Sequence, residues 1–104
     1  SRTMPTTFAP WAAADRHGAH VVRSPDGILV VTMQRVRGGV FVERAVQRQG
    51  AARVVQAIVF SSASSLHRWC DADGARFDYP LMFSRLHHGA DELFDCHADA
   101  SLAG

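Results

Sequence analysis

Lysine and asparagine are absent from this chain of 104 residues, so all 11 of its basic residues are arginine. A chain without lysine cannot complete the phosphate-binding loop G-x-x-x-x-G-K-[ST], and it cannot form a lysine Schiff base with a carbonyl substrate. Both missing residues have AT-rich codons, and alanine occurs 16 times. The composition therefore indicates a GC-rich, bacterial coding sequence.

Long apolar runs are also missing. The longest ones, at 27–33 and 57–60, are much shorter than the roughly 20 residues of a membrane span. Residues 1–8 contain no apolar stretch like the core of a signal peptide. We therefore expect no association with a membrane and a location in the cytoplasm.

Cysteine is scarce. The only two cysteines, Cys70 and Cys96, are too few for a small fold that is held together by disulfides. This pattern favours two buried or half-buried thiols in a reducing compartment. A single bridge between them is the alternative, which the sequence leaves open.

Motifs of common enzymes are lacking too. Neither the nucleophile elbow G-x-S-x-G nor the dinucleotide loop G-x-G-x-x-G occurs. Serine, histidine and aspartate are all plentiful, so their joint presence does not indicate a catalytic triad. The sequence favours a protein that is not an enzyme, and it indicates no cofactor.

What the chain does contain is one domain's worth of residues, of which 47% are hydrophobic. Prolines in the first ten residues predict an irregular N-terminal arm over 1–17. We expect Phe8 and Trp11 of this arm to pack on the domain, because exposed aromatic side chains are a liability. A single α+β domain is predicted over 18–98, followed by a frayed C-terminus over 99–104.

The first half of the domain predicts an antiparallel meander. Ser24-Pro-Asp-Gly27, Gly38-Gly39 and Gln49-Gly50 are turn sequences, and β-branched residues fill the stretches between them. Links this short force neighbouring strands to pair with each other. The predicted strands are at about 19–23, 28–36, 40–48 and 52–60.

The second half predicts two helices, at about 63–72 and 80–97, packed on one face of the sheet. Apolar residues recur at helical spacing in both. Serine hydroxyls at 61–65 can cap the first helix, and Gly74 is expected to end it in a left-handed conformation. Gly89 leaves two shorter helices as the alternative to one continuous second helix.

Two-residue turns would fix the register of the sheet. The face chosen for the core carries Val40, Val42, Arg44, Val46 and Arg48 with Val55, Ala57 and Val59. The opposite face would carry Phe41, Val54 and Ile58 and would stay partly apolar. A shift of one residue would reverse the assignment, because side chains alternate along a strand.

Charge is divided unevenly along the chain. Residues 1–56 hold eight arginines and three acids, which gives +5, whereas residues 57–104 hold three arginines and seven acids, which gives −4. We expect the acidic helices to pack on the basic sheet and pair with it. The candidate binding residues of the strands are Arg35, Arg37, Arg44, Arg48, Arg53 and Phe41.

Four side chains of the helices could bind a metal: His67, Cys70, Cys96 and His97. Zinc accepts such ligands, but four must converge on it. There is no C-x-x-C pair and no H-E-x-x-H, and adjacent residues such as Cys96 and His97 point about 100° apart on a helix. We therefore predict no metal site, and we expect His87 and His88 at the surface.

These features predict a non-enzymatic module that binds a protein partner, a second copy of itself or a ligand. The partly apolar second face of the sheet carries this expectation. The first alternative is nucleic-acid binding through the arginines of the strands. The second alternative is a small enzyme without a recognisable motif.

Overall fold

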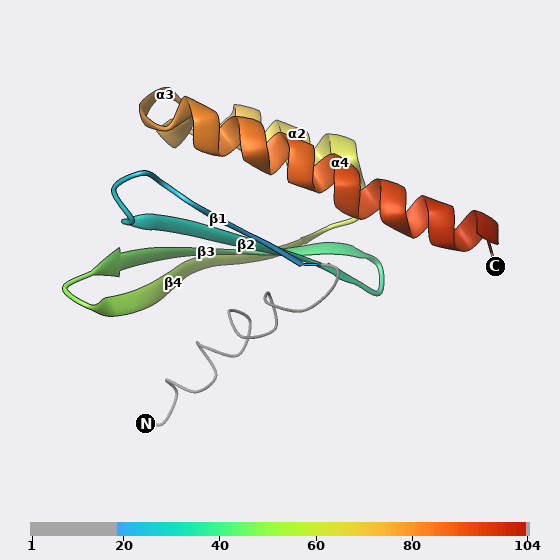
Figure 1. The fold of residues 1–104 in the computed structure, drawn as a ribbon, viewed down its shortest axis with the longest axis horizontal. Coiled ribbons are helices and arrows are strands. Elements are labelled where there is room, and N and C mark those ends of the chain that lie inside the picture. The colour runs from blue at the N-terminus through green and yellow to red at the C-terminus, as the bar shows by residue number, and fades with distance from the viewer. Residues whose placement is uncertain (1–18, 104) are drawn as a thin grey trace.

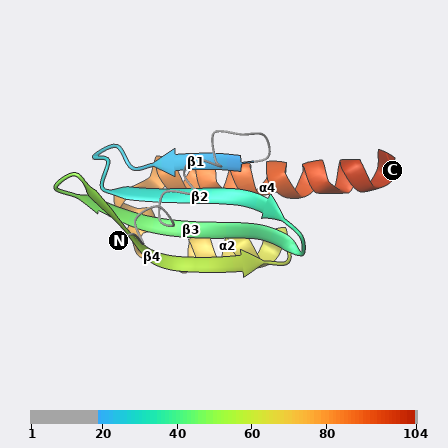
Figure 2. The same cartoon turned by 90° about the horizontal axis from the view of Figure 1, so that it is seen from below.

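The computed structural model describes residues 19–103, and it describes the side chains of residues 19–95. The elements are β1 (Ala19–Arg23), β2 (Leu29–Val36), β3 (Gly39–Arg48), β4 (Ala51–Phe60), α2 (Ala63–Asp71), α3 (Ala75–Asp78) and α4 (Pro80–Ala103). The strands form one antiparallel sheet in the order β1-β2-β3-β4, and the helices lie on one of its faces (Figures 1 and 2). The predicted α+β meander is confirmed. The predicted arm, with Phe8 and Trp11, lies outside the described residues.

The turn between β1 and β2 forms at the predicted sequence. The backbone N–H of Gly27 donates to the carbonyl oxygen of Ser24 at 2.9 Å, and Gly27 has a φ of 77°. Asp26 accepts hydrogen bonds from Ser24 and from the Tyr79 hydroxyl, the latter at 2.6 Å, and both lower the pKa of its carboxyl group. Because Tyr79 lies between α3 and α4, this bond connects the turn to the helices.

The turn between β2 and β3 lies one residue earlier than predicted. Arg37 and Gly38 form the two-residue link, and Gly39 already belongs to β3. The prediction placed the link at Gly38-Gly39. Because the turn lies one residue earlier, the register between β2 and β3 shifts by two residues, and a shift of two keeps the faces. Val40 and Val42 are buried under the helices, as predicted.

The turn between β3 and β4 forms at Gln49-Gly50, as predicted. Both residues have positive φ, 52° and 78°, which is the conformation of a type I′ hairpin turn. Arg48 therefore pairs with Ala51 at the end of the hairpin.

A β-bulge then interrupts the register of β4. Ala45 pairs with Val54, but the preceding residue Arg44 pairs with Gln56. Val55 has no partner on β3. One extra residue in a strand reverses the faces of all residues beyond it.

The predicted faces of β4 are therefore wrong beyond the bulge, whereas the predicted register holds from Ala51 to Val54. Ile58 and Phe60 lie opposite the buried valines of β3, on the side of the helices. Val55, Ala57 and Val59, which were predicted for the core, are exposed, and half of the Val55 and Val59 side chains is accessible (50% and 54%). The sequence pattern did not reveal the bulge, because every residue from 54 to 60 except Gln56 is apolar and fits either face.

The core fills the space between the sheet and the helices. Of the apolar stripe predicted for α4, the described members Met82, Leu86, Ala90 and Leu93 are buried. Trp69 of α2 packs on Phe60 with ring centroids 5.8 Å apart. The cluster comprises Val22, Leu29, Val31, Met33, Val40, Val42, Leu66, Cys70, Met82, Phe83, Leu86, Ala90 and Leu93.

The helices differ from the prediction in three details. Ser62 caps α2, as expected of this serine run, but Gly74 has a right-handed φ of −64° and precedes a short helix, α3, that was not predicted. The carboxylate of Asp73 accepts from the backbone N–H of Ala75 at 2.9 Å, which favours the start of α3 soon after α2 ends. Helix α4 is continuous and ends at Ala103 rather than at 97, since alanine-rich sequence follows.

Gly89 brings α4 close to the sheet. A Cβ atom at this position would lie 2.7 Å from Cε of Met33 on β2 and 3.6 Å from the His20 ring on β1. The missing side chain therefore permits a close approach, which explains a glycine inside an otherwise regular helix.

The face of the sheet away from the helices is buried over its two central strands. Val30, Thr32 and Ala45 are almost inaccessible there, and burial raises the pKa of Glu43. Within residues 19–95, the Oε1 atom of Glu43 has no hydrogen-bond partner. In residues 19–103, no helix has both the length and the apolar character that a membrane crossing requires.

Gly39 provides a test of the hairpin geometry. It has a φ of 145°, and a Cβ atom would lie 1.9 Å from the carbonyl oxygen of Phe60. We expect Gly39→Ala to lower the free energy of unfolding by about 2 kcal/mol or more, measured by urea denaturation. Gly74→Ala is the matched control, because Gly74 has open space around it; it should be neutral or slightly stabilising. Equal stability of the two variants would contradict this close approach of β3 to the end of β4.

Candidate functional site

Arg44, at the centre of the predicted basic surface, is paired inside the molecule. Its guanidinium forms a two-pronged salt bridge with the carboxylate of Asp73, one contact of which measures 3.3 Å from Nη2 to Oδ1. Both side chains are about five-sixths buried (17% and 16% exposed), and the guanidinium lies 5.8 Å from the Trp69 ring centroid. The expected pairing between sheet and helices is thus present at this position. Arg44 is not available to a ligand.

The other candidate arginines lie at opposite ends of the sheet. Arg35 and Arg37 are at the β2–β3 turn, whereas Arg48 and Arg53 are at the β3–β4 turn, because successive turns of a meander alternate between the two ends. Phe41, the aromatic candidate, is half-buried on the face away from the helices. The six candidates therefore do not form one surface, which disfavours binding of a nucleic-acid strand along the sheet.

A hollow of about 400 Å³ lies at the β3–β4 end and brings two of the candidates together. It is lined by Val46, Arg48, Ala51, Arg53 and Val55. Both arginines are exposed, and neither contacts a carboxylate of residues 19–95. Two of the candidate binding residues, Arg48 and Arg53, therefore line the same hollow.

The outer edge of β4 is a second exposed feature. Figure 2 shows β4 at one border of the sheet, and no described strand pairs with its outer side. The strand has ten residues, whereas the opposite edge strand β1 has five. Its only charged residue is Arg53, and it contains neither proline nor glycine. It lacks most of the features by which proteins protect an edge strand from pairing.

A histidine–aspartate cluster joins α2 to α4. Each helix carries a histidine followed four residues later by an aspartate, and the helices run antiparallel, so that each histidine faces the aspartate of the other helix. Nε2 of His87 is 2.9 Å from Oδ1 of Asp71, and Nε2 of His67 is 3.0 Å from Oδ1 of Asp91. The first contact is a hydrogen bond; the second has the distance but not the alignment of one.

The two imidazole rings of this cluster stack on each other. Their centroids are 4.3 Å apart, and their planes differ by 15°. His87 is therefore half-buried rather than at the surface as predicted, while His88 is exposed. The repeated H-x-x-x-D spacing was visible in the sequence, but only the antiparallel packing of the helices shows that the two copies meet.

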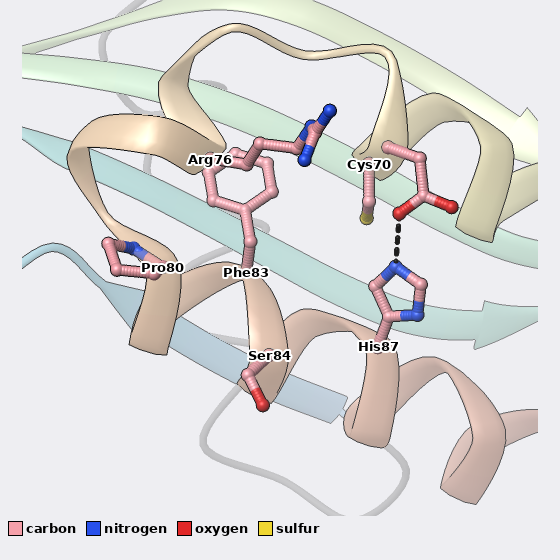
Figure 3. Close-up of a pocket in the computed structure, with 7 residues that line it drawn as sticks. Cys70, Arg76, Pro80, Phe83, Ser84 and His87 are labelled. Atoms are coloured by element: carbon pink, nitrogen blue, oxygen red, sulfur yellow. Dashed lines mark hydrogen bonds and ion pairs between the residues drawn. The ribbon is translucent and has the colours of Figure 1, made fainter.

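A shallow pocket of about 390 Å³ adjoins the cluster between α2, α3 and α4 (Figure 3). Cys70 and His87 line it, but the thiol is buried, and burial together with the carboxylates of Asp71 and Asp73 raises its pKa to about 12. The Ser84 side chain points away from the imidazole of His87 (Figure 3). Neither a thiolate nor an activated hydroxyl is therefore available as a nucleophile here.

The described residues hold no group of three histidine, cysteine or acidic side chains that could share a metal ion. Of the four metal candidates, His67 pairs with Asp91 and Cys70 faces the core. The side chains of Cys96 and His97 lie outside the described residues, so a bridge between Cys70 and Cys96 stays open.

Comparisons with protein-family models, curated proteins and solved structures gave no match. The function must therefore be inferred from the geometry of the chain itself.

Variants of the Arg44–Asp73 bridge test how much this contact between the sheet and the α2–α3 link contributes to stability. We expect Arg44→Met and Asp73→Asn each to lower the free energy of unfolding by about 2–3 kcal/mol. The double variant should lose less than the sum of the two, with a coupling of about 1–2 kcal/mol. Strictly additive losses would show that the bridge contributes nothing of its own.

The pH dependence of unfolding checks the same bridge. The hydrogen bond from Arg44 holds the pKa of Asp73 below its ordinary value of 3.8. The ionised carboxylate of Asp73 therefore contributes fully to the free energy of unfolding when the pH is above 3.8. This contribution is lost as the pH falls through the lower pKa that Asp73 has in the folded protein. The wild type should lose more stability than Asp73→Asn when the pH falls below about 4.

The burial of Cys70 leads to a prediction about the reactivity of its thiol. In a Cys96→Ser variant, the remaining thiol should react with a disulfide reagent at pH 8 at least about 100-fold more slowly in the folded protein than in urea. The reason is that burial excludes the reagent and a pKa of about 12 leaves almost no thiolate. Rapid stoichiometric labelling of the folded variant would reopen the pocket beside His87 as a catalytic site.

Proposed function

We propose that this chain is a non-enzymatic interaction module that pairs with a second copy of itself through the outer edge of β4. The observation that carries the proposal is the ten-residue edge of β4, which lacks most protecting features, with Val59 exposed beside it. Two such edges that pair antiparallel satisfy their backbone hydrogen-bonding groups and extend the sheet across both copies.

The composition of β4 suits a copy of itself. Its one charge, Arg53, lies near one end of the strand. An antiparallel pair centred in the regular segment Gln56–Phe60 keeps the two arginines apart, so no like charges face each other. The net charge of +1 per chain adds little repulsion between copies.

The proposal agrees with the geometry beyond the bulge. From Gln56 to Phe60 the pairing with β3 is regular, so the opposite edge of this segment also presents its N–H and C=O groups at regular intervals. On the face away from the helices, Ala57 and Val59 of each copy would lie beside those of the other. This contact would cover apolar surface that is exposed in the single chain.

Light scattering after gel filtration tests the proposal. We expect a mass of about twice 11.3 kDa at micromolar concentration. Val59→Lys should weaken association at least about tenfold, because each dimer would gain two charges at the edges that approach each other.

Leu81→Lys is the matched control. Leu81 is an equally apolar residue with 75% of its surface exposed, but it lies in the first turn of α4, away from β4. It should leave the mass unchanged. A wild type that stays at 11.3 kDa up to about 100 µM, or a Leu81→Lys variant that dissociates as much as Val59→Lys, would contradict pairing through β4.

A further inference from the structure

The hollow at the β3–β4 end owes its two arginines to the register of the hairpin. Arg48 pairs with Ala51, and Val46 pairs with Arg53. Directly opposite residues point to the same face, so the two arginines are diagonal neighbours on one face of the strands. Such neighbours have Cα atoms about 7–8 Å apart, and two guanidiniums on long stems can therefore reach one bound group.

Neither guanidinium is neutralised by the described part of the chain. Arg44, two pairs further along the same face of β3, is held by Asp73, whereas no carboxylate of residues 19–95 is within salt-bridge distance of Arg48 or Arg53. Two unpaired guanidiniums side by side repel each other. An anion between them removes the repulsion and accepts charge-assisted, two-pronged hydrogen bonds.

The remaining walls of the hollow are apolar. Val46 is half-buried, and Val55, the unmatched residue of the bulge, is half-exposed. Bulges near binding sites often turn a side chain out of the regular alternation. At about 400 Å³, the hollow is within the range of small-molecule sites. The lining thus matches an anionic head on a short apolar body.

We propose that this hollow binds a small amphipathic anion, with a carboxylate or phosphate monoester between Arg48 and Arg53 and an apolar chain against Val46 and Val55. The site does not depend on self-association. Pairing through β4 uses backbone groups in the plane of the sheet, whereas the hollow is lined by side chains at the β3–β4 hairpin end.

The test is a titration of the full chain with decyl phosphate and decanoate, each below its micelle concentration, followed by backbone and arginine side-chain NMR signals. We expect both to shift signals of residues 46–55, and we expect inorganic phosphate alone to bind more weakly because it lacks the apolar part. Decyltrimethylammonium, which has the same chain and the opposite charge, should not shift these signals.

Variants separate the site from general charge. The double variant Arg48→Gln, Arg53→Gln should bind decyl phosphate at least about tenfold more weakly than the wild type. Arg37→Gln removes an exposed arginine at the opposite end of the sheet and is the matched control; it should change affinity less than about twofold. Equal losses in the two variants, or equal binding of the cationic probe, would overturn the proposal.

A last arm distinguishes a free molecule from a lipid headgroup in a bilayer. Vesicles of phosphatidylcholine and phosphatidylglycerol should bind the wild-type protein no more than they bind the double variant. The reason is that a hollow of about 400 Å³ at a hairpin end holds a single free molecule. Capture by these vesicles without binding of decyl phosphate would show that the arginines meet a membrane surface instead. Binding of Val59→Lys to decyl phosphate as tight as that of the wild type would confirm that the site is independent of self-association.

Discussion

One extra residue in β4 decides which side chains of this strand are buried and which are exposed. The bulge at Val55 turns Ile58 and Phe60 toward the helices and leaves Val55 and Val59 outside. The buried half completes the core, because Phe60 supports the Trp69 ring. The exposed half gives the long edge strand its apolar side and gives the hollow at the hairpin end its wall. The apolar side of the β4 edge and the Val55 wall of the hollow therefore follow from the same irregularity.

The division of charge along the chain serves two separate purposes. At the centre of the sheet, Arg44 is used to hold Asp73, which also starts α3, so a single bridge positions the helices and the connection between them. At the hairpin end, Arg48 and Arg53 line the hollow and meet no described carboxylate. The ion pairs between α2 and α4 in the described structure join histidines to aspartates, as in His67–Asp91 and His87–Asp71.

The sequence predicted the fold better than it predicted the site. Turn sequences such as Ser24–Gly27 and the apolar spacing of α4 are local, and short links leave a meander no other way to pair. The face of β4 was not local information, because Val54, Val55 and Val59 suit either side of a sheet. Likewise, the sequence named the candidate arginines, but their grouping in space depends on Asp73, which lies between α2 and α3 and in the described structure pairs with Arg44.

The sequence by itself determined the order of elements, the stripe of α4 that is buried and, through the absence of lysine, several chemistries that this chain cannot perform. Only the tertiary structure decided that Arg44 forms a salt bridge inside the molecule, that Arg48 and Arg53 line one hollow and that the two H-x-x-x-D segments meet. The physical reason is that spacing fixes which residues share a face of one element. Contacts between elements depend on strand register and on how closely the elements approach each other. The bulge at Val55 sets the register of β4, and the missing side chain of Gly89 lets α4 approach the sheet. A local sequence pattern encodes neither of these.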